Sequence, residues 1–263
     1  MLLLLPDQIR IGLGSSYAVL AKISGHKVTH WRMQVWDDAS TTTPWEHVLP
    51  TISGWLTELK SHKLSISVVL SAELAPLHLL PWREDVTSYE KQTMLAKACF
   101  RRIHGEIADH WKIITLPSEY GYPWIASAID NRLLKALTDQ LQGMHLTSVI
   151  PLSLSLYNVL QTKLVGPACW LLVPEHKRLT AIHLRDEHWS LLQSLPISAI
   201  QHESIKDLLL RETQLAGLKA IPTQIYIASE KSNFEGCSKL DTGWKTDARV
   251  PPDSPLHLLG GRT

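Results

Sequence analysis

Two stretches of the chain, residues 9–70 and 169–229, carry the same order of predicted elements. Each begins with segments rich in Val, Ile, Thr, Tyr and Trp, in which apolar and polar residues alternate. Polar clusters such as 24–27 and 185–188 separate these segments. Alternation of this kind is typical of half-buried β-strands, and the polar clusters predict turns between them. Each stretch therefore predicts a meander of antiparallel strands.

A helix and a further strand follow each meander. The helical segments are 44–60 and 203–216, and the second carries Ile205, Leu208, Leu209 and Leu215 on one predicted stripe. Because a strand–helix–strand crossover returns right-handed onto the same sheet, each final strand is expected beside the first strand of its meander. Two such units predict two lobes that face each other. Chance similarity of two common arrangements is the alternative.

Composition limits the class of protein. The chain has 263 residues, 44% of them hydrophobic, which is enough for one large or two modest domains with real cores. The formal net charge is +1, so no long-range field would attract nucleic acid or an anionic membrane. We therefore expect no nucleic-acid partner.

The cysteines and the N-terminal segment indicate the compartment. Cys99, Cys169 and Cys237 are odd in number and widely spaced, which favours a reducing compartment and excludes the paired spacing of a structural zinc site. The opening segment MLLLLP is shorter than the apolar region of a signal peptide, and no run of about 18 apolar residues occurs. The sequence predicts a cytosolic protein with no membrane span of its own.

Residues 71–146 separate the two units and have a different pattern. The segment LAPLHLLPW (74–82) predicts a strand, 88–111 a long helix, 111–116 and 124–129 two strands, and 130–143 a second helix. This order predicts a small α+β subdomain inserted in the first lobe.

The two helices of this insert have different signals. The first repeats apolar residues every four positions, at Leu95, Cys99, Ile103 and Ile107, which predicts a buried stripe. The second has all the features of a complete helix: an N-terminal Asp130, a leucine-rich face and a terminating Gly143.

The domain organisation follows from these segments. Pro151 opens a short helix that would connect the lobes, with a hinge near Gly166 and Pro167. The expected division is a first lobe, an α+β insert, a second lobe and a polar, proline-containing tail. In residue numbers these are 1–70 with 147–165, then 71–146, 166–230 and 231–263.

This order of elements resembles the actin-like ATPase fold, a duplicated, ribonuclease H-like α/β fold. Within it the chain is similar to PilM proteins and to the cytoplasmic domains of GspL-type proteins, over roughly residues 7–230. The similarity is strongest from VVLSAELAPLHLLPW (68–82) through ASAIDNRLLKALTDQLQGMHLTSVIPLSLSLYNVL (126–160). It is a similarity of pattern, without a rare signature peptide.

ATP chemistry in that fold needs an acidic residue and small residues in the first turn of each lobe, for magnesium and phosphate. Gly12, Gly14, Ser15 and Ser16 keep the small character in the first lobe, but no Asp precedes them. We interpret them as the remnant of a phosphate loop. The second-lobe turn, 173–178, has no glycine. The Gly-Gly pair expected beside adenine occurs at Gly260-Gly261 in the tail.

Other motifs are weaker. Asp241-Thr242-Gly243 spells the triplet of aspartic proteases, but it has no second copy, and catalysis there needs two facing carboxylates. Gly12-x-Gly14 lacks the remaining residues of a dinucleotide or P-loop motif. His183 and His188 have no zinc-helix spacing. We expect no catalytic residue, no metal site and no cofactor.

The resemblance implies a non-catalytic scaffold in the inner-membrane platform of a type IV pilus or type II secretion system, peripheral to the membrane. Its implied partners are the cytoplasmic tail of a bitopic inner-membrane platform protein and the assembly ATPase. The alternatives are a phosphotransferase like sugar or acetate kinases, an ATP-dependent switch, or a cytoskeletal filament protein. The phosphotransferase needs an acidic magnesium ligand, and Asp7 and Glu175 are the nearest candidates.

Overall fold

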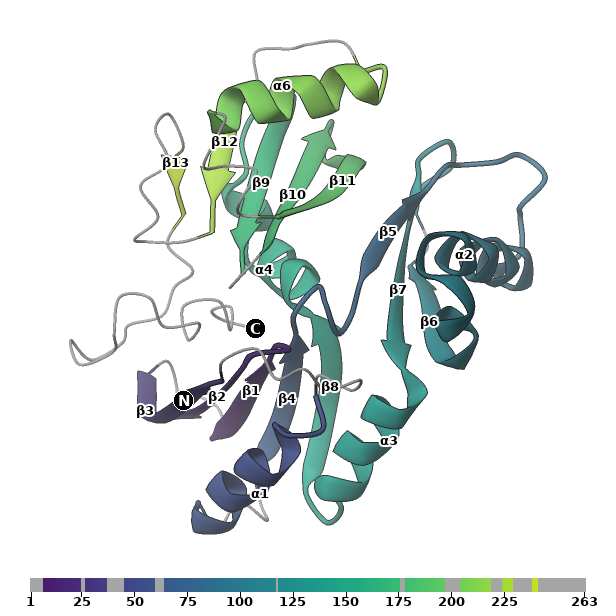
Figure 1. Cartoon of the computed structure of the whole chain (residues 1–263). Coiled ribbons are helices and arrows are strands. Elements are labelled where there is room, and N and C mark those ends of the chain that lie inside the picture. Colours follow the sequence, from purple (N-terminus) through teal and green to yellow (C-terminus); the bar gives the residue numbers. More distant parts are fainter. Residues whose placement is uncertain are drawn as a thin grey trace, which may run out of the picture.

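The computed structural model shows two lobes joined by one helix, with a third sheet beside them (Figure 1). It describes residues 7–24, 27–36, 45–59, 64–116, 118–175, 178–196, 204–218, 224–228 and 238–240. The segments Gly260-Gly261 and 241–243, and also Cys237, lie outside the described residues.

The first lobe is a five-stranded sheet in the order β3-β2-β1-β4-β8. Its strands are β1 Gln8–Leu13, β2 Tyr17–Ser24, β3 Lys27–Val35, β4 Ser65–Leu70 and β8 His145–Pro151. The meander β1–β2–β3 is antiparallel, and β4 pairs parallel with β1 after helix α1 (Leu49–Glu58), as a right-handed crossover requires.

The second lobe repeats this plan in the order β11-β10-β9-β12-β13. Its elements are β9 Ala168–Pro174, β10 Arg178–Arg185, β11 His188–Pro196, helix α6 Ile205–Leu215, β12 Gln224–Ile227 and β13 Ser238–Lys239. The duplication predicted from the sequence is confirmed. Ile205, Leu208 and Leu209 are buried under α6, but Leu215 is 76% exposed, because it is the last residue of the helix.

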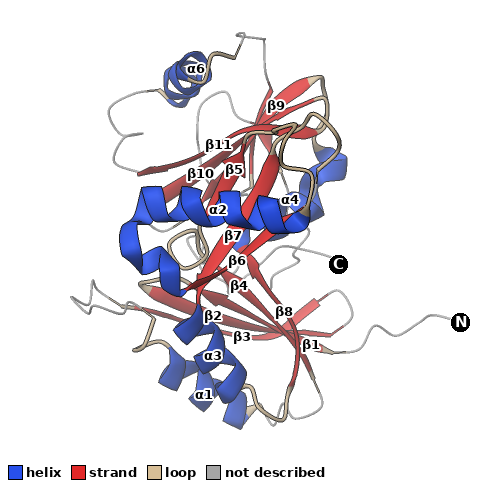
Figure 2. Cartoon of the chain, turned by 90° about the vertical axis from the view of Figure 1, so that its right-hand side faces the viewer, coloured by secondary structure: helices blue, strands red, loops and turns tan. Residues whose placement is uncertain are grey.

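The third sheet belongs to the insert and has the order β5-β7-β6. Its strands are β5 Leu77–Leu80, β6 Trp111–Leu116 and β7 Trp124–Asp130, and helix α2 (Tyr89–His104) covers one face (Figure 2). The 3₁₀ helix η1 (Gly105–His110) follows α2. The predicted strands and long helix of this segment are confirmed.

The buried stripe predicted for α2 is wrong in its C-terminal half. Ala96 and Phe100 are the buried residues, whereas Ile103 and Ile107 are 51% and 50% exposed. The α-helix ends at His104, and Gly105 takes a φ of 76°, so Ile107 lies on a separate 3₁₀ turn.

Helix α3 (Asn131–Gln140) has the predicted termini: the Asp130 carboxylate accepts from the Arg132 N–H, and Gly143 has a φ of 84°. Its buried leucines belong to the same core as the first sheet, and it lies beside α1 (Figure 2). We therefore propose that the insert ends near residue 130 and that α3 belongs to the first lobe.

Helix α4 (Leu152–Leu160) connects the lobes and is followed by the 3₁₀ turn η2 (Gln161–Lys163). Leu152, Leu156 and Leu160 share one hydrophobic core with residues of both large sheets. Ser153 and Ser155 are also buried, because α4 has neighbours on several sides. Leu240, beyond β13, also joins this core, so we propose that the second lobe extends at least to residue 240.

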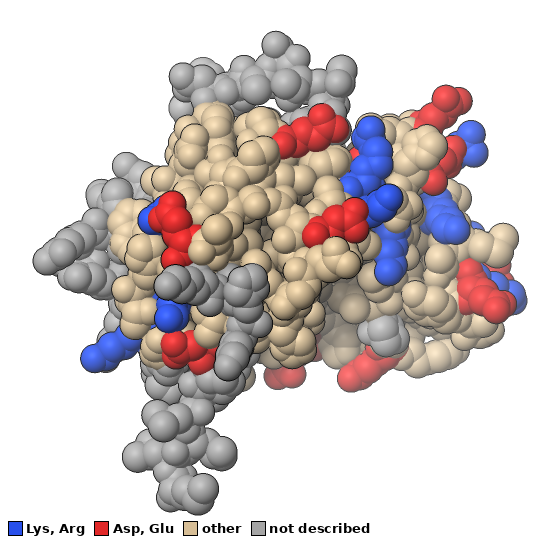
Figure 3. Space-filling view, turned by 90° about the horizontal axis from the view of Figure 1, so that it is seen from below, with Lys and Arg blue, Asp and Glu red and all other residues tan. Residues whose placement is uncertain are grey.

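Charged side chains of both signs lie on the surface. On the face shown in Figure 3, basic and acidic side chains are interspersed, as the net charge of +1 leads one to expect. No helix in the described part of the chain is both long and apolar enough to span a bilayer. Cys99 and Cys169 are both free.

Candidate functional site

The candidate site lies between the lobes, where the β1–β2 turn of the first lobe meets the end of β9. Gly12 lies inside β1, paired with both neighbouring strands, whereas Gly14, Ser15 and Ser16 form the turn. The Gly14 N–H donates to the Tyr17 carbonyl over 2.9 Å. The structure therefore places three of the four predicted remnant residues in the turn and one in the strand.

The side chain of Tyr17 covers this turn. Its ring occupies the space that a Cβ at Gly14 would need, which explains why only glycine fits there. Ser16 is buried, and its carbonyl accepts from the Trp36 N–H over 2.8 Å. The small residues therefore make room for the protein's own aromatic ring.

A carboxyl group crosses from the second lobe to the first. Glu175, directly after β9, is 7% exposed, and its Oε2 accepts from the Ala72 N–H over 2.8 Å. Its Oε1 accepts from the Thr180 hydroxyl over 3.3 Å. We call these two contacts the Glu175 bridge. Because Ala72 follows β4, the bridge ties the end of one central strand to the end of the other.

The pKa of Glu175 is raised to about 7, mainly by burial and to a smaller extent by the nearby Glu73, while the two hydrogen bonds and Arg178 act in the opposite direction. Burial also raises the pKa of Tyr17, and the charges of Glu175 and Glu73 add to that. Ser15 donates its hydroxyl hydrogen bond to Glu73. The turn interpreted from the sequence as the remnant of a phosphate loop thus lies beside two carboxyl groups, and charge repulsion disfavours an anion there.

Arg178, which lowers the pKa of Glu175, directs its side-chain hydrogen bonds elsewhere. Arg178 donates from Nε to the Ser194 hydroxyl over 2.8 Å and from its terminal nitrogen to the Ser194 carbonyl over 2.9 Å. The described residues contain no cluster of three side chains that could hold a metal ion. Asp7 pairs with Lys22 at the start of β1, roughly 20 Å of strand away from the turn. Glu175, the other candidate magnesium ligand, is engaged in the bridge.

A cavity of about 370 Å³ adjoins the bridge. Glu73 and Thr180 line it on the side of the bridge, and Trp111 and Leu192 contribute apolar surface. His78 and His104 also line it, with their Nε2 atoms 2.9 Å apart. Burial lowers the pKa of His78 to about 4, and the neighbouring His104 adds to this; burial also lowers the pKa of His104. Two neutral imidazoles can share one hydrogen bond, so the pair is a neutral wall of the cavity.

Sequence reasoning missed most of this site. It singled out the glycines and serines of the turn, but not Tyr17, Glu73, Ala72 or Thr180. It considered Glu175 only as a candidate magnesium ligand of the alternative phosphotransferase. The available signal was the combination of Gly14 with a tyrosine three residues later and an acidic residue in the opposite turn.

Comparison with known proteins gives the fold. No protein-family model matches the chain, and no curated protein matches it in sequence. Among solved structures, one similar protein is from Bacteroides thetaiotaomicron, with an actin-like ATPase fold and unknown function. It has 11% identity and a TM-score of 0.59, over 87% of this chain and 84% of that one.

Two further structures belong to secretion and pilus systems. The cytoplasmic domain of EpsL, an inner-membrane component of the Vibrio cholerae type II secretion system, has 11% identity and a TM-score of 0.57. The match covers 96% of this chain and 92% of that one. A chain of the PilM–PilN type IV pilus biogenesis complex has 11% identity and a TM-score of 0.59, over 97% and 94%. The chain has the actin-like ATPase fold, so the predicted fold class is confirmed.

Proposed function

We propose that this protein is a non-catalytic cytoplasmic scaffold of the inner-membrane platform of a type IV pilus or type II secretion system. The observation that carries the proposal is the turn after β1, where Tyr17, Glu73 and Glu175 occupy the place at which the resemblance implies a phosphate loop. The shared fold with the cytoplasmic domain of EpsL and with PilM supports the choice of machine.

The competing function is a phosphotransferase or an ATP-dependent switch. It would need open backbone N–H groups for phosphate and a carboxylate for magnesium. The N–H groups of Gly14 and Ala72 are already hydrogen-bonded within the protein, and Asp7 lies at the far end of β1. These contacts favour the scaffold.

We expect calorimetric titration with magnesium-ATP to show no binding at millimolar nucleotide in a sample shown to be folded. The physical reason is that phosphate would have to displace the Tyr17 ring and approach two carboxyl groups. Binding tighter than about 100 μM, near −5.5 kcal/mol, would contradict the scaffold and favour the ATP-dependent function.

The proposed partners are the cytoplasmic tail of a bitopic inner-membrane protein and the assembly ATPase, with the protein peripheral at the membrane. An extended tail can add to the edge of a sheet and place apolar side chains in neighbouring pockets. The apolar segment 74–82 suggests that the tail binds at the insert. Its leucines are not available for that contact, because Leu77 and Leu79 pack against the interlobe core and Leu80 lies under α2. The uncovered apolar residue of this sheet is Ile114, 45% exposed on the edge strand β6.

We therefore propose that the tail adds along β6, with an apolar side chain against Ile114. The test uses the synthetic cytoplasmic tail of the bitopic protein encoded beside a pilus or secretion ATPase in the same genome. Ile114→Asp should weaken tail binding at least about tenfold, since it places a charge in an apolar contact.

The matched control is Met94→Asp on α2, where the side chain is 70% exposed on the other side of the insert. It should leave tail binding unchanged. Equal loss in both variants, or no loss in either, would argue against β6 as the site, and a tail that does not bind the unaltered protein would contradict the proposed function.

A further inference from the structure

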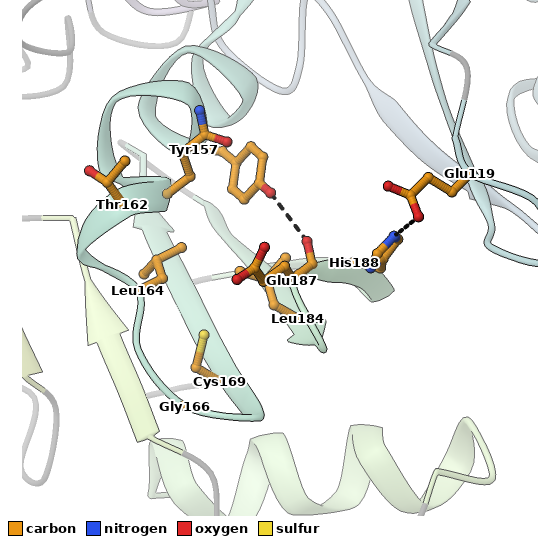
Figure 4. Close-up of a pocket in the computed structure, with 10 residues that line it drawn as sticks. Glu119, Tyr157, Thr162, Leu164, Gly166, Cys169, Leu184, Glu187 and His188 are labelled. Carbon is orange, nitrogen blue, oxygen red and sulfur yellow. Dashed lines mark hydrogen bonds and ion pairs between the residues drawn. The ribbon is translucent and has the colours of Figure 1, made fainter.

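A second cavity, of about 420 Å³, lies where the second lobe meets the insert, away from the Glu175 bridge. Its walls come from α4, the segment between η2 and β9, the tip of the β10–β11 hairpin, and the insert loop that carries Glu119 (Figure 4). The cavity thus brings together the insert at Glu119, the segment 157–169 and the hairpin at 184–188.

The hairpin tip is fixed in an uncommon conformation. Asp186 and Glu187 have φ values of 50° and 66°, as a two-residue type I′ turn requires. Glutamate is rare in this region of backbone space. The turn is secured by the Asp186 N–H to the Pro167 carbonyl, 2.9 Å, and by the Tyr157 hydroxyl to the Glu187 carbonyl, 3.5 Å. These contacts hold the backbone of Glu187 at the cavity, and its side chain points toward Leu164 (Figure 4).

The insert supplies a second carboxylate. The imidazole of His188 stacks on Tyr122, with ring centroids 3.5 Å apart, and its Nε2 lies 3.4 Å from Glu119 Oε2. Its Nδ1–H donates to the Asp186 carbonyl over 2.6 Å. Glu119 is thereby positioned at the cavity across from Glu187 (Figure 4).

Apart from His188 and the two glutamates, the lining is aromatic, apolar or uncharged and polar, the polar residues being Gln161 and Thr162. Leu164 and Leu184 supply aliphatic surface, and burial raises the pKa of Cys169 to about 11, so its thiol is neutral. Burial also raises the pKa of Tyr157. No lysine or arginine lines the cavity; the nearby Arg185 lies 3.7 Å from Asp186, and Lys163 has its own interaction.

We propose that this cavity binds an arginine side chain from the platform partner's cytoplasmic tail. The guanidinium would lie between the Glu187 and Glu119 carboxylates and against the Tyr157 ring, with its aliphatic stem on Leu164 and Leu184. Arginine suits this lining because its planar group both pairs with carboxylates and stacks on aromatic faces, while its stem buries on apolar surface.

The inference rests on the proposed scaffold function. Cytoplasmic segments next to membrane helices are enriched in lysine and arginine, so a bitopic partner would present such a side chain close to the membrane. The β6 edge would hold the extended part of the tail, and this cavity its basic part.

The test is NMR titration of the whole protein with N-acetyl-arginine amide, following the backbone amides of Gly166, Glu187 and His188. We expect saturable shifts at these amides, with affinity on the order of millimolar for a single side chain. N-acetyl-citrulline amide, which has nearly the same shape without the charge, should give no saturable shift. Added salt should weaken arginine binding.

Glu187→Gln should weaken arginine binding about threefold, whereas Glu106→Gln, the same change on the exposed surface of η1, should not. Equal shifts with citrulline, tighter binding of N-acetyl-lysine amide, or equal affinity in both variants would overturn the inference.

The two proposals fail differently. If arginine binds in this cavity but no platform tail binds the protein, the scaffold function is wrong and the chemistry of the cavity stands. If a platform tail binds with unchanged affinity after its arginines are replaced by glutamine, the cavity assignment is wrong and the scaffold function stands.

Discussion

Replacing Glu175 with glutamine should stabilise the protein by about 3 kcal/mol at about pH 8 and have little effect near pH 4. The reason is the raised pKa of this carboxyl, about 7 against an ordinary value of 4.5, caused mainly by burial. Glutamine can keep both contacts of the bridge: its oxygen accepts from the Ala72 N–H, and its amide N–H can donate to the Thr180 hydroxyl. It removes only the buried charge.

The direction of the pH dependence follows from the shift. Since the folded-state pKa is above the unfolded-state value, the unfolded protein loses this proton first as pH rises from about 4.5. The contribution of Glu175 to stability is therefore full below about pH 4.5 and is lost progressively up to about pH 7. In the glutamine variant this loss should be absent, so its free energy of unfolding should exceed that of the unaltered protein by an amount that grows across this window.

Denaturant unfolding at several pH values measures this difference. Glu106→Gln, on the exposed surface, is the matched control and should follow the unaltered protein at every pH. Glu175→Ala should be less stable than Glu175→Gln at every pH by about 1–3 kcal/mol, because it also removes the charge but leaves the partly buried Ala72 N–H without its acceptor. A pH-independent difference between Glu175→Gln and the unaltered protein would show that the pKa of Glu175 is the same in the folded and unfolded states, and would contradict the raised pKa.

The duplicated lobes could be predicted because their signals are local. Alternation in the strands, Asp130 at a helix start and Gly143 at its end depend on residues a few positions apart, and all three predictions were confirmed. The stripe on α2 failed for a geometric reason. Four-residue steps advance about 400° around a helix, so the positions from Leu95 to Ile103 drift about 40° per step away from the buried side, and Ile107 lies beyond the end of the α-helix.

The contents of the interlobe site could not be predicted in the same way. Ala72 and Glu175 are 103 positions apart, and their contact depends on how far the lobes close. The resemblance to nucleotide-binding proteins directed attention to absent residues, such as an aspartate before Gly14. It gave no reason to ask which side chains fill the space that a phosphate would take.

The same dependence on lobe closure gives the second large prediction, which concerns Leu156. Leu156→Ala should destabilise the protein by about 2–5 kcal/mol, since this fully buried side chain of α4 would leave a cavity. Its core contains residues from both large sheets, so the loss should reach both lobes together. Hydrogen exchange should show amides of β2 and of β9 losing protection in the same experiment.

Leu133→Ala is the matched control, because Leu133 is equally buried but lies in the core of the first lobe alone. Leu133→Ala should destabilise the protein by a similar amount. Hydrogen-exchange protection should be lost first at the amides of β1 and β4 and later at those of β9. If Leu156→Ala reduced hydrogen-exchange protection in only one lobe, the lobes would be independent folding units, and α4 would be only a linker between them. Simultaneous loss would instead mean that the closed arrangement holding Tyr17 and Glu175 together is part of the native core, as a scaffold that does not open for nucleotide requires.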